Sequence, residues 1–198
     1  MRTFISVLLV GTACVALAAS LTLRQPLQSR WQVAEVTGHL PDLQFALTDD
    51  AGHPVTQNAW RGKIVLLYFG FTHCPDECPV TMARLAGIFR KLGPDGDRFH
   101  ALFVTVDPAR DHPAVLHAFI AQFEPAYMTG LTSNAAALRA LARAYRTAFE
   151  PATGSAPLVH GDGIYIFDTE GHARLLATDA DPDAALIADL TRLARESN

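Results

Sequence analysis

An apolar segment followed at once by a helical pattern limits the fold of this chain more than any other feature. Residues 63–69 read Lys-Ile-Val-Leu-Leu-Tyr-Phe, an apolar run rich in residues that favour strands. Such a run is typical of a strand buried on both faces, at the centre of a sheet covered by helices. Residues 76–92 then carry apolar side chains at helical spacing and end at Gly93-Pro94. We therefore expect a central strand, a loop and a helix.

The same alternation of strand and helix patterns continues to the C-terminus. Apolar strand patterns recur at 100–106, 163–167 and 173–177, and helical patterns at 113–123, 135–145 and 183–195. Before the central strand, residues 44–48 alternate apolar and polar side chains ahead of a turn and Pro54-Val55, as in a hairpin. This order predicts a thioredoxin-like α/β sandwich, in which helices flank a central mixed sheet, with an added N-terminal hairpin.

The composition fits one folded domain and gives no sign of nucleic-acid binding. Hydrophobic residues make up 49% of the chain and charged residues 18%, a balance typical of a globular protein. The formal net charge is -4, so the chain lacks the basic surface that nucleic acids attract. We expect no nucleic-acid partner.

The N-terminus predicts a membrane-targeting segment. Residues 4–23 contain no charged side chain, and twenty residues suffice to cross a bilayer core of about 30 Å as a helix. We favour an uncleaved anchor, although Ala16-Leu17-Ala18 also fits a signal-peptidase site. Either way the rest of the chain lies outside the cytoplasm, on the periplasmic side in a bacterium. The expected organisation is an anchor or signal peptide at 1–24, a linker at 25–39 and a domain at 40–198.

Two of the three cysteines belong to the predicted domain. Cys14 lies within the apolar N-terminal segment, whereas Cys74 and Cys78 follow the central strand at the start of a helix. Backbone amides and the dipole at a helix N-terminus favour the thiolate, which is the form that attacks disulfides and binds metals. Two thiolates are soft ligands that suit copper(I). A stabilising disulfide between the two cysteines is the alternative interpretation of this spacing.

Three groups of residues together carry a family resemblance. They are Gly-Phe-Thr-His-Cys-Pro-Asp-Glu-Cys-Pro at 70–79, Val-Thr-Val-Asp-Pro-Ala-Arg-Asp at 104–111, and His160 followed five residues later by Tyr165. Over about residues 43–195 the chain resembles the Sco/SenC copper chaperones of cytochrome oxidase assembly. The resemblance implies a thioredoxin fold in which Cys74, Cys78 and His160 bind copper(I) or copper(II). It also implies cytochrome c oxidase subunit II, with its dinuclear copper site, as the partner.

The chain departs from that family pattern at two places. The family usually has Asp before the metal-binding histidine and Ser or Thr after it, whereas Val159 and Gly161 flank His160 here. The orientation of the imidazole is therefore left open, and Asp162 is a candidate for the missing acidic partner. Glu77 places a carboxylate between the cysteines, where the family more often has an apolar residue. Its charge would either raise the thiol pKa values or favour a bound cation.

Other residues near the motif are weaker candidates. His73 adjoins Cys74 and is a candidate transient ligand, although a neighbouring side chain usually points away. Asp107 ends a predicted strand, where it either faces the site or stabilises the following turn. We expect Asp76 to cap the helix and Phe71 to pack in the core or shield a metal. The remaining histidines are expected at the surface or in turns: His39, His53, His100, His112, His117 and His172.

Two functions would use the same pair of thiols. The favoured one is a copper metallochaperone, which would not be an enzyme. The alternative is a thiol-disulfide oxidoreductase that reduces the cysteines of the oxidase copper site. A thiol peroxidase is disfavoured because Phe71 stands where its active site needs a threonine. A structural zinc site is disfavoured because three ligands leave its four-coordinate shell incomplete.

Overall fold

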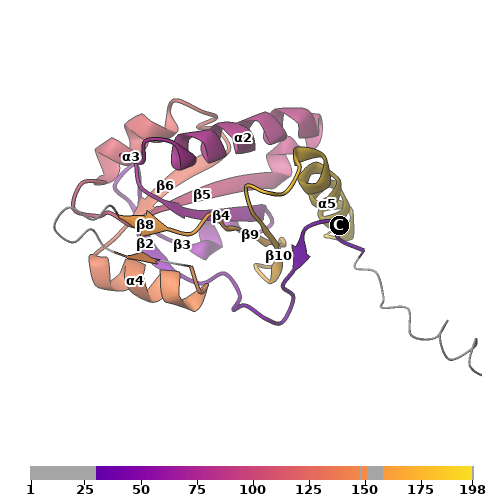
Figure 1. Ribbon diagram of the computed structural model, residues 1–198, viewed down its shortest axis with the longest axis horizontal. Coiled ribbons are helices and arrows are strands. Elements are labelled where there is room, and N and C mark those ends of the chain that lie inside the picture. The colour runs from indigo at the N-terminus through magenta and orange to yellow at the C-terminus, as the bar shows by residue number, and fades with distance from the viewer. Residues whose placement is uncertain (1–29, 148, 151–157, 198) are drawn as a thin grey trace, which may run out of the picture. The chain divides into compact units, whose positions relative to one another are not determined.

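An eight-stranded mixed sheet organises the residues that the computed structural model describes, which are 30–147, 149–150 and 158–197 (Figure 1). The strand order is β1-β10-β9-β4-β5-β6-β2-β3. The bounds are β1 Ala34–Glu35, β2 Ala46–Asp49, β3 Pro54–Thr56, β4 Ile64–Gly70, β5 Phe99–Thr105, β6 Met128–Thr132, β9 Ile164–Phe167 and β10 Ala173–Ala177. β4, β5 and β6 are parallel and the other pairs are antiparallel. The expected mixed sheet is confirmed.

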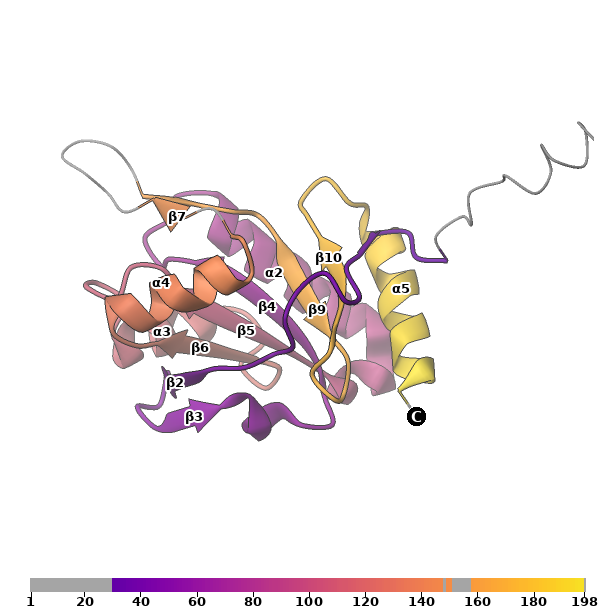
Figure 2. The ribbon, with the colours of Figure 1, turned by 90° about the horizontal axis from the view of Figure 1, so that it is seen from below.

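Helices cover both faces of this sheet. They are α2 Glu77–Leu92, α3 Pro113–Ile120, α4 Ala135–Ala144 and α5 Asp183–Glu196, with short 3₁₀ turns at Gln57–Trp60 and Gly93–Arg98. Side chains of α2, α3 and α5 pack in one core cluster and those of α4 in another, and Figure 2 shows α4 and α2 on opposite sides of the sheet. Every residue of β4 is buried, and its side chains alternate between the two clusters. The apolar run therefore forms the central strand, as its lack of polar residues predicts.

The hairpin and the strands with clear patterns form where the sequence predicts them. β2 pairs with β3 in antiparallel fashion, with Leu47 opposite Val55. The strand β6 was not expected, because glycine and two threonines interrupt its sequence Met-Thr-Gly-Leu-Thr. A separate two-stranded ribbon of β7 (Phe149–Glu150) and β8 (Val159–His160) was not expected either, since two residues show no periodicity.

The folded unit begins before residue 40. Trp31 and Val33 are each 4% exposed and belong to the core cluster that contains α5. The carboxylate of Asp189 in α5 accepts hydrogen bonds from the amides of Gln32 and Val33 at 2.7 and 2.9 Å. Residues 31–39, which the sequence places in a linker, are therefore part of the domain. Residues 4–23, the expected anchor, lie outside the described residues, and no helix within the described part is long and apolar enough to span a membrane.

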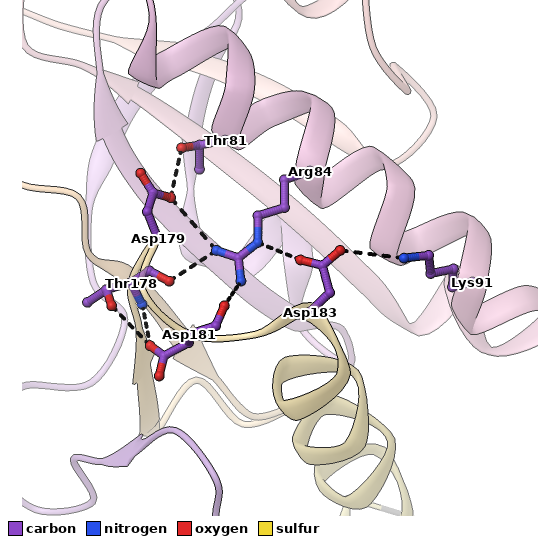
Figure 3. Close-up of polar contacts among 7 residues, drawn as sticks. All are labelled: Thr81, Arg84, Lys91, Thr178, Asp179, Asp181 and Asp183. Carbon is purple, nitrogen blue, oxygen red and sulfur yellow. Dashed lines mark hydrogen bonds and ion pairs between the residues drawn. The ribbon is translucent and has the colours of Figure 1, made fainter.

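Arg84 fixes α2 to the connection between β10 and α5 (Figure 3). Its guanidinium donates to the carbonyl of Thr178 at 3.0 Å and to the carboxylate of Asp183 at 2.8 Å, and lies 3.7 Å from Asp179. The arginine side chain is only 13% exposed. This contact neutralises an acidic loop and holds the helix that carries Cys78.

Candidate metal centre

The pairing of β9 with β4 brings a distant histidine to the two cysteines. Ile164 of β9 lies opposite Tyr68 of β4 in an antiparallel pair, so the chain just before β9 passes the carboxyl end of β4. The loop with Cys74 leaves β4 at this same end. His160 is the last residue of β8, four residues before Ile164. The sheet therefore delivers an imidazole to the thiols from 82 residues further along the chain.

Cys74, Cys78 and His160 form one cluster of potential ligands. One sulfur or nitrogen atom from each residue lies within 4.8 Å of the other two. Nε2 of His160 is 3.3 Å from Sγ of Cys78, and the amide of Cys78 donates to Sγ of Cys74 at 3.5 Å. Both cysteines are free thiols, with Cys78 buried and Cys74 half-buried. The three residues that the sequence predicts as metal ligands thus lie together, and Cys74 is the most exposed of them.

The orientation of His160 is set by a backbone carbonyl. Its Nδ1 lies 3.0 Å from the carbonyl oxygen of Gly161, which can only accept a hydrogen bond. Nδ1 therefore carries the proton and Nε2 presents its lone pair to the sulfurs, as a metal-binding imidazole requires. Asp162 is exposed, and no hydrogen bond between it and this ring is seen among the described residues. The carbonyl of Gly161 thus orients the His160 ring in place of the aspartate that is absent before the histidine.

Two aromatic rings enclose the imidazole. Tyr68 and Phe71 both contact the His160 ring edge to face, with centroids 5.9 and 5.6 Å away. Phe71 is 8% exposed, so it both packs in the core and shields the site. The hydroxyl of Tyr68 donates to Sγ of Cys78 at 3.9 Å. The inner part of the cluster is therefore shielded from water, which strengthens electrostatic interactions within it.

The two thiols differ in acidity. Burial raises the pKa of Cys74, but its interaction with the His160 ring and hydrogen bonds from the amides of Cys78 and Asp76 outweigh it and hold that pKa below the ordinary thiol value. Burial raises the pKa of Cys78 to about 12, and the neighbouring Cys74 adds to this shift. Cys74 is therefore the more readily formed thiolate, whereas Cys78 must lose its proton when it becomes a metal ligand.

Gly70 leaves room for the sulfur of Cys78, a role that no pattern in the sequence predicts. A Cβ atom at this last residue of β4 would lie 2.7 Å from Sγ of Cys78 and 2.8 Å from Cε2 of Phe103. Real Cβ contacts are not that short, so a side chain here would displace the sulfur or the ring. The signal was present as the glycine of the Gly-Phe-Thr motif, but its physical reason needs the packing.

Asp111 anchors the loop before the cysteines and was also not singled out. It is buried, and its carboxylate accepts hydrogen bonds from the amide of Thr72 at 2.9 Å and from the hydroxyls of Thr72 and Thr105 at 2.6 Å. The sequence suggests Asp107 as the residue that faces the site. Its carboxylate forms an ion pair with Arg110, and its backbone carbonyl accepts hydrogen bonds from the amides of Arg110 and Asp111. Asp107 thus stabilises the turn, and Asp111 holds the site.

The structure also places the weaker candidates. His73 is 52% exposed and bonds to the hydroxyl of Thr72, outside the ligand cluster. Asp76 occupies the N-cap position of α2, but its side chain makes no capping hydrogen bond. His100 differs from the expected surface position, because it is half-buried against Trp60 and burial lowers its pKa to about 4.

Comparisons with known proteins agree with this arrangement. Residues 36–195 match the sequence profile of the SCO1/SenC family. The mitochondrial protein SCO2 of Saccharomyces cerevisiae is 36% identical over 133 residues, covering 64% of this chain and 44% of the yeast protein. The chain spans about half the length of the first curated relatives that it matches.

Solved structures show the same fold. Copper-bound ScoI of Bradyrhizobium japonicum has a TM-score of 0.66 and 33% identity, and the match covers 77% of this chain and 98% of that one. Copper-bound yeast Sco1 has a TM-score of 0.70 and 28% identity, with 77% and 87% covered. The fold is thioredoxin-like, as expected. Because the family profile matches most of its length, this chain belongs to the SCO1/SenC family.

Proposed function

We propose that this chain is a copper metallochaperone that binds the ion through Cys74, Cys78 and His160 and delivers it to the dinuclear copper centre of cytochrome c oxidase subunit II. The observation that supports this most is the convergence of two sulfurs and one imidazole nitrogen within 4.8 Å. Thiolates suit copper(I) and imidazole suits copper in general, so the donor set fits this metal. Copper is bound in two solved relatives of the same family.

The geometry is suited to transfer as well as to binding. Cys74 is half-buried, whereas Cys78 and His160 are buried. An incoming thiolate or imidazole can reach a copper ion from the Cys74 side and replace that ligand first. Transfer then proceeds by exchange of ligands without release of the free ion.

An exposed apolar side chain in the first turn of α2 is suited to docking. Val80 of α2 is 65% exposed, and it is the one large hydrophobic side chain that is exposed in the described part of the chain. It lies two residues after Cys78. Single exposed apolar residues are common on protein surfaces, but one in the first turn of the helix that carries a metal ligand can contribute to a transient interface.

The N-terminal segment supports a location at a membrane. We propose that residues 1–24 hold the domain at a membrane, on its non-cytoplasmic side, which is the periplasm in a bacterium. The twenty uncharged residues at 4–23 have the length and composition of an anchor.

A second function, reduction of the cysteines of the oxidase copper site, is favoured by one observation. The pKa of Cys74 is lowered while that of Cys78 is raised. An accessible thiolate beside a buried thiol is the arrangement of an attacking and a resolving cysteine in thiol-disulfide exchange. This role does not need His160 as a metal ligand.

The two functions are distinguished by a transfer experiment. The full chain, loaded with copper(I), is mixed with the reduced, copper-free soluble domain of oxidase subunit II. Transfer of copper to that domain is the expected result, and Val80→Lys is expected to slow it without changing the copper affinity. If the reduced domain receives no copper, while its oxidised disulfide form is reduced by the metal-free chain, the oxidoreductase is the correct account.

A further inference from the structure

The three clustered side chains supply fewer ligands than copper(II) prefers. Copper(II) in proteins favours a square-planar or tetragonal set that includes nitrogen or oxygen donors, whereas soft thiolates favour copper(I). Cys74, Cys78 and His160 give two sulfurs and one nitrogen. A fourth donor would therefore matter more to copper(II) than to copper(I).

Most oxygen donors near the site are already engaged. The carboxylate of Asp111 is occupied by the hydroxyls of Thr72 and Thr105, and that of Asp107 by Arg110. The hydroxyl of Tyr68 donates its proton to the sulfur of Cys78. None of these groups presents a free carboxylate oxygen to the cluster.

Glu77 differs from all of these. Its Oε2 lies 3.9 Å from Nε2 of His160, the same nitrogen that faces the sulfur of Cys78. No other hydrogen bond or ion pair of this side chain is seen in the part of the chain that the structure describes. The side chain is 61% exposed, so rotation about its own bonds can bring the carboxylate closer. Glu77 is also the first residue of α2, where the helix dipole stabilises a negative charge.

We propose that the Glu77 carboxylate completes the coordination of copper(II) as an oxygen ligand and thereby sets the preference of the site between the two oxidation states. The inference rests on the proposed copper function. A carboxylate adds negative charge beside the ion, and a doubly charged cation gains more from it than a singly charged one. Glu77 therefore strengthens the binding of copper(II) relative to copper(I) and lowers the reduction potential of the bound ion.

The test compares Glu77→Gln and Glu77→Val with the unaltered full chain and with Asp76→Asn. Asp76 is the matched control, because its carboxylate is exposed, lies one residue away and makes no hydrogen bond or ion pair with the cluster among the described residues. Each protein is loaded with copper(II) alone for electron paramagnetic resonance. Its affinities for copper(II) and copper(I) are then measured by competition with chelators, the latter under reducing conditions.

Both Glu77 variants are expected to change the copper(II) resonance and to weaken copper(II) binding by about tenfold. Copper(I) affinity should change by much less, so the reduction potential should rise by about 59 mV for each tenfold change in the ratio of affinities. The control should match the unaltered protein in every measurement.

Two results would overturn the proposal, and they are distinguishable. If the unaltered chain binds copper but both Glu77 variants keep its resonance and its ratio of affinities, the role of Glu77 is refuted and the proposed function stands. If the unaltered chain binds no copper in either oxidation state, the proposed function fails and this inference fails with it.

Discussion

Nε2 of His160 lies 3.3 Å from Sγ of Cys78, although 82 residues separate the two in the chain. Strand pairing produces this contact, because Ile164 lies opposite Tyr68 and the residues before it pass the end of β4. The contact also depends on local packing. Gly70 leaves space for the sulfur, and the carbonyl of Gly161 turns the ring toward it.

The packing at Gly70 predicts that Gly70→Ala disturbs the metal centre. The new Cβ would lie 2.7 Å from Sγ of Cys78, so either the sulfur or the ring of Phe103 must move. We expect copper affinity to fall and the free energy of unfolding to decrease by about 1–3 kcal/mol. Copper competition and chemical denaturation measure the two effects.

Gly87→Ala is the control for that substitution. Its Cβ, in the middle of α2, would meet only an atom of Arg90 at 3.8 Å. We expect unchanged copper affinity and a stability equal to or above that of the parent by about 0.5–1 kcal/mol, since alanine favours the helix. Equal effects of both substitutions on copper affinity would refute the role of Gly70.

The hydrogen bond from His160 to Gly161 predicts that Asp162→Asn leaves copper binding unchanged. The backbone carbonyl already fixes the proton on Nδ1 and the lone pair on Nε2. Copper(II) affinity and the absorption spectrum should therefore match those of the unaltered chain. A loss of affinity of about tenfold or more would show that Asp162, and not the carbonyl, orients the imidazole.

The unequal acidity of the two thiols predicts an order of alkylation in the metal-free chain. Cys74 should react with iodoacetamide first at pH 7, because its lowered pKa and its partial exposure favour attack. The rate at Cys78 should keep rising toward pH 12, since its pKa is raised to about 12. Mass spectrometry of the labelled peptides measures both rates, and equal labelling at pH 7 would contradict the assignment.

The same pKa shift predicts how copper binding depends on pH. Cys78 is protonated in the metal-free protein below its raised pKa and must release that proton to bind copper. The apparent affinity should therefore rise with pH, by up to about tenfold per unit for this single proton. Competition with a chelator of known protonation behaviour measures this slope of affinity against pH. An affinity that stays constant between about pH 6 and pH 8 would argue against ligation by Cys78.

The contacts of Arg84 predict a large effect on stability. Arg84→Ala removes a guanidinium that joins α2 to Asp183 and to the carbonyl of Thr178, and leaves Asp179 without its neighbouring cation. We expect the free energy of unfolding to fall by about 1–3 kcal/mol. Arg90→Ala is the control, because Arg90 is 63% exposed on the same helix, and it should change stability by less than about 0.5 kcal/mol. Similar losses in both variants would contradict the assigned role.

Much of the fold follows from local patterns in the sequence. The run at 63–69 predicts a buried central strand, and the spacing after residue 76 predicts the helix with the cysteines at its start. β1 and the β7–β8 ribbon are not predictable in this way, because two-residue strands have no periodicity. The sequence pattern therefore places Trp31 and Val33 in a linker, although they are buried in the core cluster that contains α5.

The sequence predicts the three residues of the candidate site, but it does not predict the contacts that hold them in place. His160 is one of eight histidines, and only the family resemblance distinguishes it. The carbonyl of Gly161 and the carboxylate of Asp111 act through contacts between segments far apart in sequence or through the backbone. No periodicity or composition encodes such contacts. They become visible only when the pairing register and packing are known.

Titration of copper(II) into the full chain, compared with Cys74→Ala, Cys78→Ala and His160→Ala, decides whether the three clustered residues bind the metal. We expect the unaltered protein to show a thiolate-to-copper charge-transfer band that all three variants lose, because each removes one member of the cluster. A band and an affinity that persist in His160→Ala would contradict the assignment of the imidazole as a ligand and would favour a dithiol redox protein.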